Sequence, residues 1–299
     1  MRLLFAILLA FGATFAATTD KNHYCAAMVK CLDTKPSDCS EADFKPAAKI
    51  KYDAEYCEPF KEMQARGLKA GTKVGREVYT KLAGDYRVIY ESKGTLQATA
   101  DMMAFLFDNM SFTAKLINAY KDASYDLHYT SKDRKKFAGS NGRSLSGTFT
   151  WALQDSAGTK LGLRNVFMGY GSAQVLKWKL HGSAVAVLDL DPKKDGRVKY
   201  RLRAIVFPGN SVLNSIMQMR IFKAVVGDKI DHIVSDIVSS AKSFADGNRK
   251  PIQKSKDFEA GEMKQTMELF NQVTEGKLKW QLGDWQNHEG LRNGTKAKP

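Results

Sequence analysis

The sequence predicts an α+β fold in which an antiparallel β-sheet packs against one long C-terminal amphipathic helix. Apolar and polar residues alternate in several segments between residues 86 and 207, which is typical of strands with one buried face. From Val212 to Phe244, apolar residues instead recur every three, four or seven positions, which is typical of a helix with one apolar stripe. Both patterns fall within residues 84–246, which we take as the main domain.

The domain is expected to begin with a strand that is followed by two helices. Tyr86, Val88 and Tyr90 alternate with the residues of the opposite strand face. Thr99 is a suitable N-cap for the first helix, because its hydroxyl can accept a hydrogen bond from a free backbone N–H. A break near residues 109–111 divides the apolar stripe, so we expect a helix pair.

A strand-rich stretch follows the helix pair. Apolar residues share one face of two strands: Tyr125, Leu127 and Tyr129 in the first, and Leu145, Phe149, Trp151 and Leu153 in the second. Further strands are expected at residues 161–170, 173–180, 184–190 and 197–207. Hairpins with one solvated face favour an antiparallel sheet. The long helix is expected over residues 212–246, where Gly227 costs about 1 kcal/mol relative to Ala and allows a bend.

The N-terminus has the pattern of a cleaved signal peptide, residues 1–16. Arg2 precedes an apolar run from Leu3 to Phe11, and small residues end at Ala16, where we expect cleavage. The run is too short for a membrane anchor, which needs about 20 apolar residues. We therefore expect a soluble protein in an extracytoplasmic location, either periplasmic or secreted.

Residues 17–83 form a helix-prone segment that contains all four cysteines of the chain, Cys25, Cys31, Cys39 and Cys57. In an exported protein, an even and clustered set of cysteines predicts disulfides. Zinc is the alternative, but no pair has the short C-x-x-C spacing. Two disulfides are expected, and all three pairings stay open. Residues 54–66 predict a helix that ends at Gly67.

Residues 247–299 form a polar C-terminal extension with one possible helix at residues 258–273 and a tail that we expect to be disordered from Asn287 onwards. The formal net charge of the chain is +14. Export argues against a nucleic-acid partner, and an anionic membrane or envelope-polymer surface fits the compartment better. The alternative is that dispersed lysines only keep the surface soluble.

The order of elements (strand, helix pair, about six antiparallel strands, long amphipathic helix) resembles the helix-grip fold of the START-like superfamily, also called polyketide-cyclase-like. The resemblance covers residues 84–246 and rests on element order, since no motif carries it. It implies a curved sheet that grips the long helix around a cavity for lipids, sterols or other apolar molecules. The candidate lining residues are Tyr125, Tyr129, Phe149, Trp151, Trp178, Tyr200 and Met219, with Met217 as an alternative to Met219. The same residues would also suit a filled core.

We find no catalytic constellation, cofactor motif or metal site in the sequence. No G-x-S-x-G occurs, and Gly169-Tyr170-Gly171 lacks the context of a phosphate loop. Asp189, Asp191 and Asp195 gather carboxylates as calcium loops do, but Lys193 stands where an oxygen ligand is needed, so a turn is expected.

The sequence therefore favours a non-enzymatic protein that binds or transfers an apolar, lipid-like ligand. The alternative is an envelope or structural protein whose basic surface binds an anionic partner. An enzyme on the same fold stays open as a third hypothesis.

Overall fold

The structure, a computed structural model, describes residues 54–82, 87–154, 163–175, 178–208 and 211–288. The predicted signal peptide, Cys25, Cys31, Cys39 and the side chain of Cys57 lie outside the described part, and so does the tail from residue 289. Disulfide formation and signal cleavage therefore stay predictions. Within the described residues, we find no helix that is both long and apolar enough to cross a membrane.

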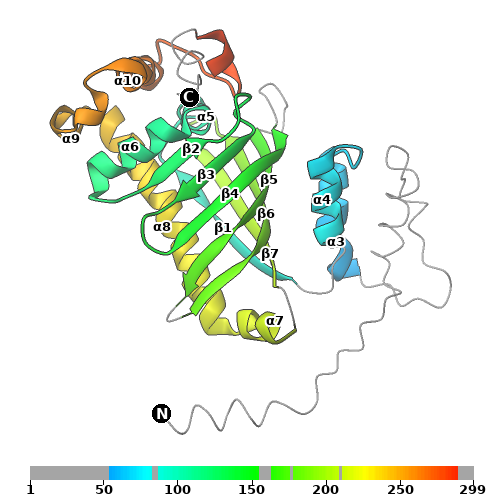
Figure 1. The fold of residues 1–299 in the computed structure, drawn as a ribbon. Helices are drawn as coiled ribbons and strands as arrows, with labels where there is room; N and C mark the ends of the chain where they lie inside the picture. The colour runs from blue at the N-terminus through cyan, green and yellow to red at the C-terminus, as the bar shows by residue number, and fades with distance from the viewer. Residues whose placement is uncertain (1–53, 83–86, 155–162, 176–177, 209–210, 289–299) are drawn as a thin grey trace, which may run out of the picture.

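One antiparallel sheet of seven strands forms the centre of the fold (Figure 1). Its strands are β1 (Val88–Leu96), β2 (Asp126–Tyr129), β3 (Lys136–Ser140), β4 (Leu145–Gln154), β5 (Leu163–Val175), β6 (Trp178–Pro192) and β7 (Val198–Phe207). The order across the sheet is β1-β7-β6-β5-β4-β3-β2, so that the first strand pairs with the last. The predicted antiparallel α+β class is confirmed.

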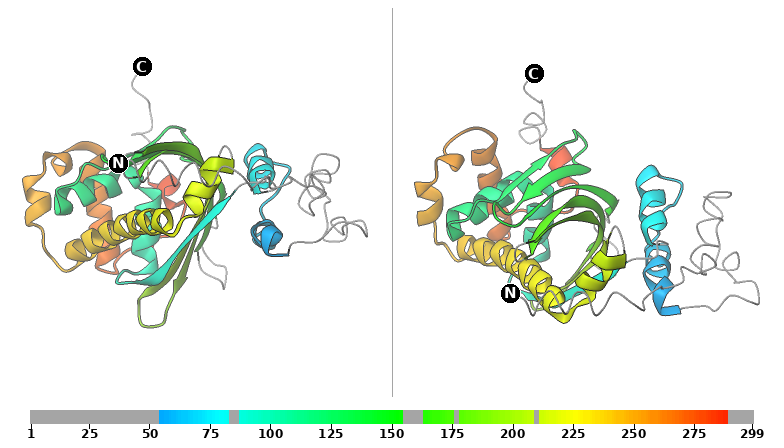
Figure 2. Two further views of the ribbon diagram at one scale, coloured as in Figure 1. Left: turned by 90° about the horizontal axis from the view of Figure 1, so that it is seen from below. Right: turned by 60° about the horizontal axis from the view of Figure 1, so that its bottom comes forward.

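The sheet curves around a long helix, α8 (Arg220–Ala245), which follows α7 (Ser211–Gln218) (Figure 2). The predicted helix pair is present as α5 (Ala100–Asp108) and α6 (Met110–Lys121), and it joins β1 to β2. The predicted N-cap is confirmed, since the Thr99 hydroxyl accepts a hydrogen bond from the backbone N–H of Met102 at 3.2 Å. This is the helix-grip arrangement that the element order implies.

Three details of the sequence prediction are wrong. The helix expected over 212–246 is interrupted at Met219, whose extended backbone separates α7 from α8; α8 continues through Gly227. The strand expected at 173–180 straddles the hairpin between β5 and β6. Leu153 does not share a face with Trp151, because a bulge between them shifts the register and turns Leu153 to the convex face.

Two helices, α3 (Ala54–Ala65) and α4 (Lys73–Leu82), cover the convex face of the sheet. The helix predicted at residues 54–66 is confirmed as α3. Apolar residues from both helices bury Val166, Met168, Val185 and Ile205 of the sheet. A segment of two short helices therefore gains its apolar burial from the sheet.

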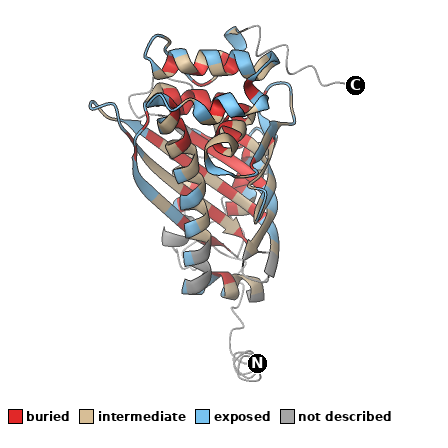
Figure 3. Cartoon of the chain, turned by 90° about the vertical axis from the view of Figure 1, so that its left-hand side faces the viewer, coloured by how far each residue is buried: buried red, intermediate tan, exposed pale blue. Residues whose placement is uncertain are grey.

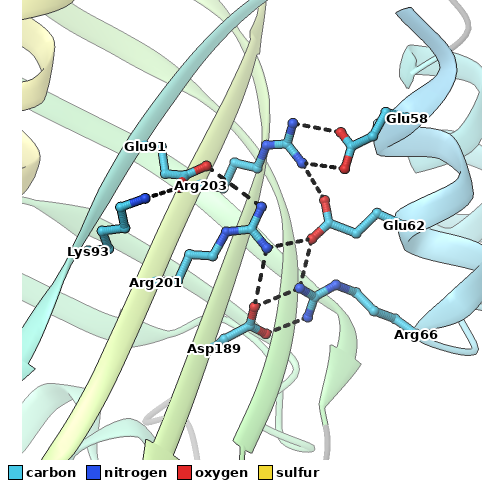
Figure 4. A network of polar contacts seen from close by, with 8 residues as sticks. All are labelled: Glu58, Glu62, Arg66, Glu91, Lys93, Asp189, Arg201 and Arg203. Atoms are coloured by element: carbon cyan, nitrogen blue, oxygen red, sulfur yellow. Dashed lines mark hydrogen bonds and ion pairs between the residues drawn. The ribbon is translucent and has the colours of Figure 1, made fainter. Parts of the chain in front are cut away.

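Charged side chains fix α3 to the sheet as well (Figure 4). Arg66 donates to both carboxylate oxygens of Asp189 on β6, at 2.5 and 2.7 Å. Arg203 on β7 donates to Glu58 at 2.7 Å and to Glu62 at 2.6 Å. Asp189 thus lies at the end of the strand expected at 184–190 and forms an ion pair. The turn expected for the acidic stretch begins at Lys193.

The C-terminal extension contributes to the main core instead of standing outside it. It contains α9 (Lys250–Lys254), α10 (Gly261–Thr274) and two short 3-10 helices, η2 (Lys256–Phe258) and η3 (Asp284–Asn287). Phe270 and Trp280 pack against Phe105 of α5, with ring centroids 5.1 and 4.6 Å apart. The buried Asp108 carboxylate accepts hydrogen bonds from the Trp280 indole at 3.0 Å and from the Gly283 N–H at 2.7 Å.

Candidate ligand-binding cavity

The concave face of the sheet is built from small residues where it approaches the first half of α8. Side chains that alternate along the strands place the even-numbered residues of β6 and β7 here, while Val185, Val187 and Ile205 pack on the convex side. The small residues on the concave face are Gly139, Gly147, Gly169, Gly171, Ala173, Gly182, Ala184, Ala186 and Ala204. Their lack of bulk leaves space between the sheet and the helix.

Four of these glycines form one row across four strands. Gly139 pairs with Gly147, Gly147 with Gly171, and Gly171 with Gly182. The backbones approach closely within the row: a Cβ on Gly171 would lie 2.2 Å from the Ser146 carbonyl oxygen and 2.8 Å from the Gly147 Cα. Glycine at such positions permits a tight bend of a sheet. We attribute the hollow of the concave face to this row.

The resulting cavity has a volume of about 390 Å³. Its helix wall consists of Val226, Ile230, Ile233 and Ile237 of α8, with Met217 of α7 at one side. Phe137, Phe149 and Tyr125 line it from the edge of the sheet. The volume falls within the range of about 300–1,000 Å³ that is usual for small-molecule sites.

The other half of the concave face is filled. Trp151 packs between Phe167 and Phe107, at centroid distances of 4.0 and 6.3 Å, and Tyr129 donates a hydrogen bond from its hydroxyl to the Phe107 carbonyl at 2.9 Å. In Figure 3, buried residues are concentrated towards the end of the sheet that α5 and α10 cover. The interior is thus a packed core at one end and a cavity at the other.

The structure brings together some of the predicted lining residues and separates others. Tyr125 and Phe149 line the cavity, and Met217 does so in place of Met219, which is 53% exposed. Tyr129 and Trp151 belong to the filled half. The Tyr200 ring lies against Gly94, and its hydroxyl shares a hydrogen bond with the Ser92 hydroxyl at 2.9 Å. The side chain of Trp178 lies outside the described part of the chain.

Sequence reasoning missed the small residues and one lysine. Glycine and alanine carry no pattern that separates a cavity wall from an ordinary strand, and only the register puts the glycines in a row. Lys229 also lines the cavity, and it lies beside the apolar residue Ile230 that the helical stripe did identify. The position of Lys229 beside this apolar stripe is the one feature of the sequence that could have indicated it as a lining residue.

Polar residues also line the cavity: three tyrosines, four serines, Asn141, His181 and Lys229. The Tyr125 hydroxyl donates to Asp236 of α8 at 2.9 Å; burial, followed by this neighbouring carboxylate, raises the pKa of Tyr125. Tyr90 on β1 is 4% exposed, and burial raises the pKa of its phenol to about 12. The Tyr90 hydroxyl has no hydrogen-bond partner among the described residues.

Tyr90→Phe is expected to leave the free energy of unfolding unchanged or to raise it, because a buried hydroxyl without a partner costs about 1–3 kcal/mol. Tyr79 is the matched control: it is equally buried, but its hydroxyl donates to the Leu68 carbonyl at 2.7 Å. Tyr79→Phe is expected to cost about 1 kcal/mol. Urea unfolding of both variants measures the difference, and equal losses would contradict the assignment of Tyr90 as unpartnered.

No protein-family model matches this sequence, and a search of curated proteins finds no relative. Solved structures overlap about half of the chain. A hypothetical protein from Helicobacter pylori is 9% identical over 52% of this chain and 89% of its own, with a TM-score of 0.36. Ara h 8.0201 is 12% identical over 51% and 96%, with a TM-score of 0.36. The Zhui aromatase/cyclase from Streptomyces is 9% identical over 53% and 95%, with a TM-score of 0.29.

Identities of 9–12% and TM-scores of 0.36 or below do not indicate a function for this chain. The assignment to an α+β, helix-grip class rests on the sheet topology of this chain. The first strand, β1, pairs with the last, β7, and the antiparallel sheet curves around α8.

Proposed function

We propose that this protein binds an apolar small molecule in the cavity between the sheet and α8, and that it does so as a soluble protein outside the cytoplasm. The cavity is the observation that carries the proposal: it has a volume of about 390 Å³, a helix wall made mainly of apolar side chains, and a sheet wall rich in glycine and alanine. The proposed location rests on the signal-peptide pattern of residues 1–16.

An apolar ligand suits this wall for energetic reasons. Moving apolar surface out of water contributes about 25 cal/mol for each Å² buried, so a ligand that fills the cavity gains most from its apolar area. Isoleucine side chains of α8 have no polar partner to offer, whereas the atoms of a ligand restore the dispersion contacts that an empty space lacks. Binding or transfer of a lipid-like molecule therefore follows more directly than catalysis.

Native mass spectrometry of protein purified without detergent tests the proposal. We expect a fraction of the molecules to carry one small apolar molecule, which organic extraction should release and which the denatured protein should lack. After delipidation, one equivalent of an added fatty acid or alcohol should bind again. Protein that is free of ligand as purified and that takes up none afterwards would contradict the proposal and favour the alternative of an anionic-surface binder.

A further inference from the structure

Lys229 is the one lysine, arginine, aspartate or glutamate among the described residues that line the cavity. Lys229 lies on α8 next to Ile230, whereas its neighbours Asp228 and Asp231 do not line the cavity. The wall around it combines apolar side chains of α8, glycines and alanines of the sheet, and polar residues that include Asn141 and His181. A single lysine in this wall is a feature that the proposed function does not explain.

Lys229 is held at the rim by a hydrogen bond to the sheet. Its Nζ donates to the Ser144 Oγ at 2.9 Å, across the gap between α8 and the loop that joins β3 to β4. The loop is itself fixed, because the Asn141 Oδ1 accepts hydrogen bonds from the backbone N–H groups of Ser144 and Leu145, both at 2.9 Å. The ammonium group is therefore positioned before any ligand arrives.

The positive charge has no carboxylate partner within the described part of the chain. Asp231 accepts from Ser92 at 2.5 Å, and Asp236 accepts from Tyr125 at 2.9 Å, so both are engaged elsewhere. Asp228, the residue before Lys229, is exposed to solvent. An ammonium group has three N–H donors, and the Lys229 ammonium uses one of them in its hydrogen bond to Ser144.

We infer that the cavity takes an amphipathic carboxylate, whose apolar body fills the space under α8 and whose carboxylate is bound by the Lys229 ammonium beside Ser144. This inference rests on the proposed function and adds the chemical class of the ligand. One ammonium group in the wall matches the single negative charge of a carboxylate. Charge-assisted hydrogen bonds are about twice as strong as neutral ones, so the head group selects among ligands with equal apolar bodies.

Dodecanoate and 1-dodecanol are suitable probes because they share one chain and differ in the charge of the head group. We expect the delipidated protein to bind dodecanoate about tenfold more tightly than the alcohol, the factor that a hydrogen bond to a charged group supplies. Lys229→Met keeps the length and apolar stem of the side chain but removes the charge. In this variant the preference should disappear, mainly through weaker binding of dodecanoate. Isothermal titration calorimetry measures both affinities.

Lys242→Met is the matched control. Lys242 lies on the same helix, is exposed, and pairs with Asp246 one turn later, away from the cavity. The preference for dodecanoate should be unchanged in this variant.

Equal affinities for the two probes in the parent protein, or a preference that survives Lys229→Met, would overturn the inference and leave the cavity proposal intact. Tighter binding of dodecyl phosphate than of dodecanoate would overturn the assignment of a monoanionic head group. Failure of every probe to bind would instead contradict the proposed function itself.

Discussion

Replacing Gly171 by Ala is expected to lower the free energy of unfolding by about 3 kcal/mol, at the upper end of the usual cost of overpacking. The new Cβ would meet the Ser146 carbonyl oxygen at 2.2 Å and the Gly147 Cα at 2.8 Å. Both are backbone atoms of β4, so no side chain can rotate away. The two strands must separate, and the hydrogen bonds and the bend next to the cavity are lost with them. Urea unfolding measures the loss.

Gly182 provides the control within the same row. A Cβ there would approach only the Phe207 carbonyl oxygen, at 3.4 Å. Gly182→Ala should therefore be neutral or slightly stabilising, since glycine in a strand costs about 0.5–1 kcal/mol relative to alanine. Similar losses for the two variants would contradict the view that close backbone contact at Gly171 shapes the sheet.

The period of the apolar residues is sufficient to predict most elements of this fold. Alternation identifies β1, β2, β4 and β7, and the stripe identifies α8, because each element buries one face. The break at Met219 was not predictable from the stripe, which continues through it. Leu153 was placed on the wrong face because a bulge changes the register without changing the alternation of residue types.

The helix expected at residues 258–273 is present as α10, but the packing of the C-terminal extension into the core escaped the sequence reasoning for a related reason. Trp280, Leu282 and Trp285 are buried, but they are single apolar residues in an irregular, polar stretch and show no helical or strand period. Their partners, Phe105 and Asp108, lie more than 170 positions earlier, and such contacts leave no local pattern.

The cavity could be predicted only in outline. The element order implies a space between sheet and helix, but large aromatic residues were the expected lining. In the structure Trp151 and Tyr129 fill one half of the interior, and the absence of side chains at Gly139, Gly171 and Gly182 leaves the other half open. The alignment of these glycines depends on the registers of three strand pairs, and these registers cannot be predicted from any local segment of the sequence.

Ala184→Phe is expected to block the cavity. Ala184 lines it from β6 and pairs with Gly169, so a phenyl ring at this position enters the empty space. Ligand affinity should fall by roughly tenfold or more, a change of about 1.4 kcal/mol for each factor of ten. Stability should change by less than about 1 kcal/mol, since the added apolar burial offsets the strain of the larger side chain. Calorimetric titration with dodecanoate and urea unfolding measure the two effects.

Val185 is the neighbouring residue on the opposite face of the same strand, where it is fully buried under α3 and α4. Val185→Ala should cost about 2 kcal/mol through the cavity that it leaves. Ligand affinity should nevertheless be retained, because the substitution does not alter the concave face. The pair of variants thus separates an effect on the site from an effect on stability.

The most direct test of an apolar ligand site under α8 is the dissociation constant for dodecanoate, measured for the parent protein, Ala184→Phe and Val185→Ala. We predict binding of one equivalent to the parent protein and to the less stable Val185→Ala, and strongly weakened binding to the stable Ala184→Phe. Binding of equal strength to all three proteins would place the ligand elsewhere and contradict the cavity as the functional site.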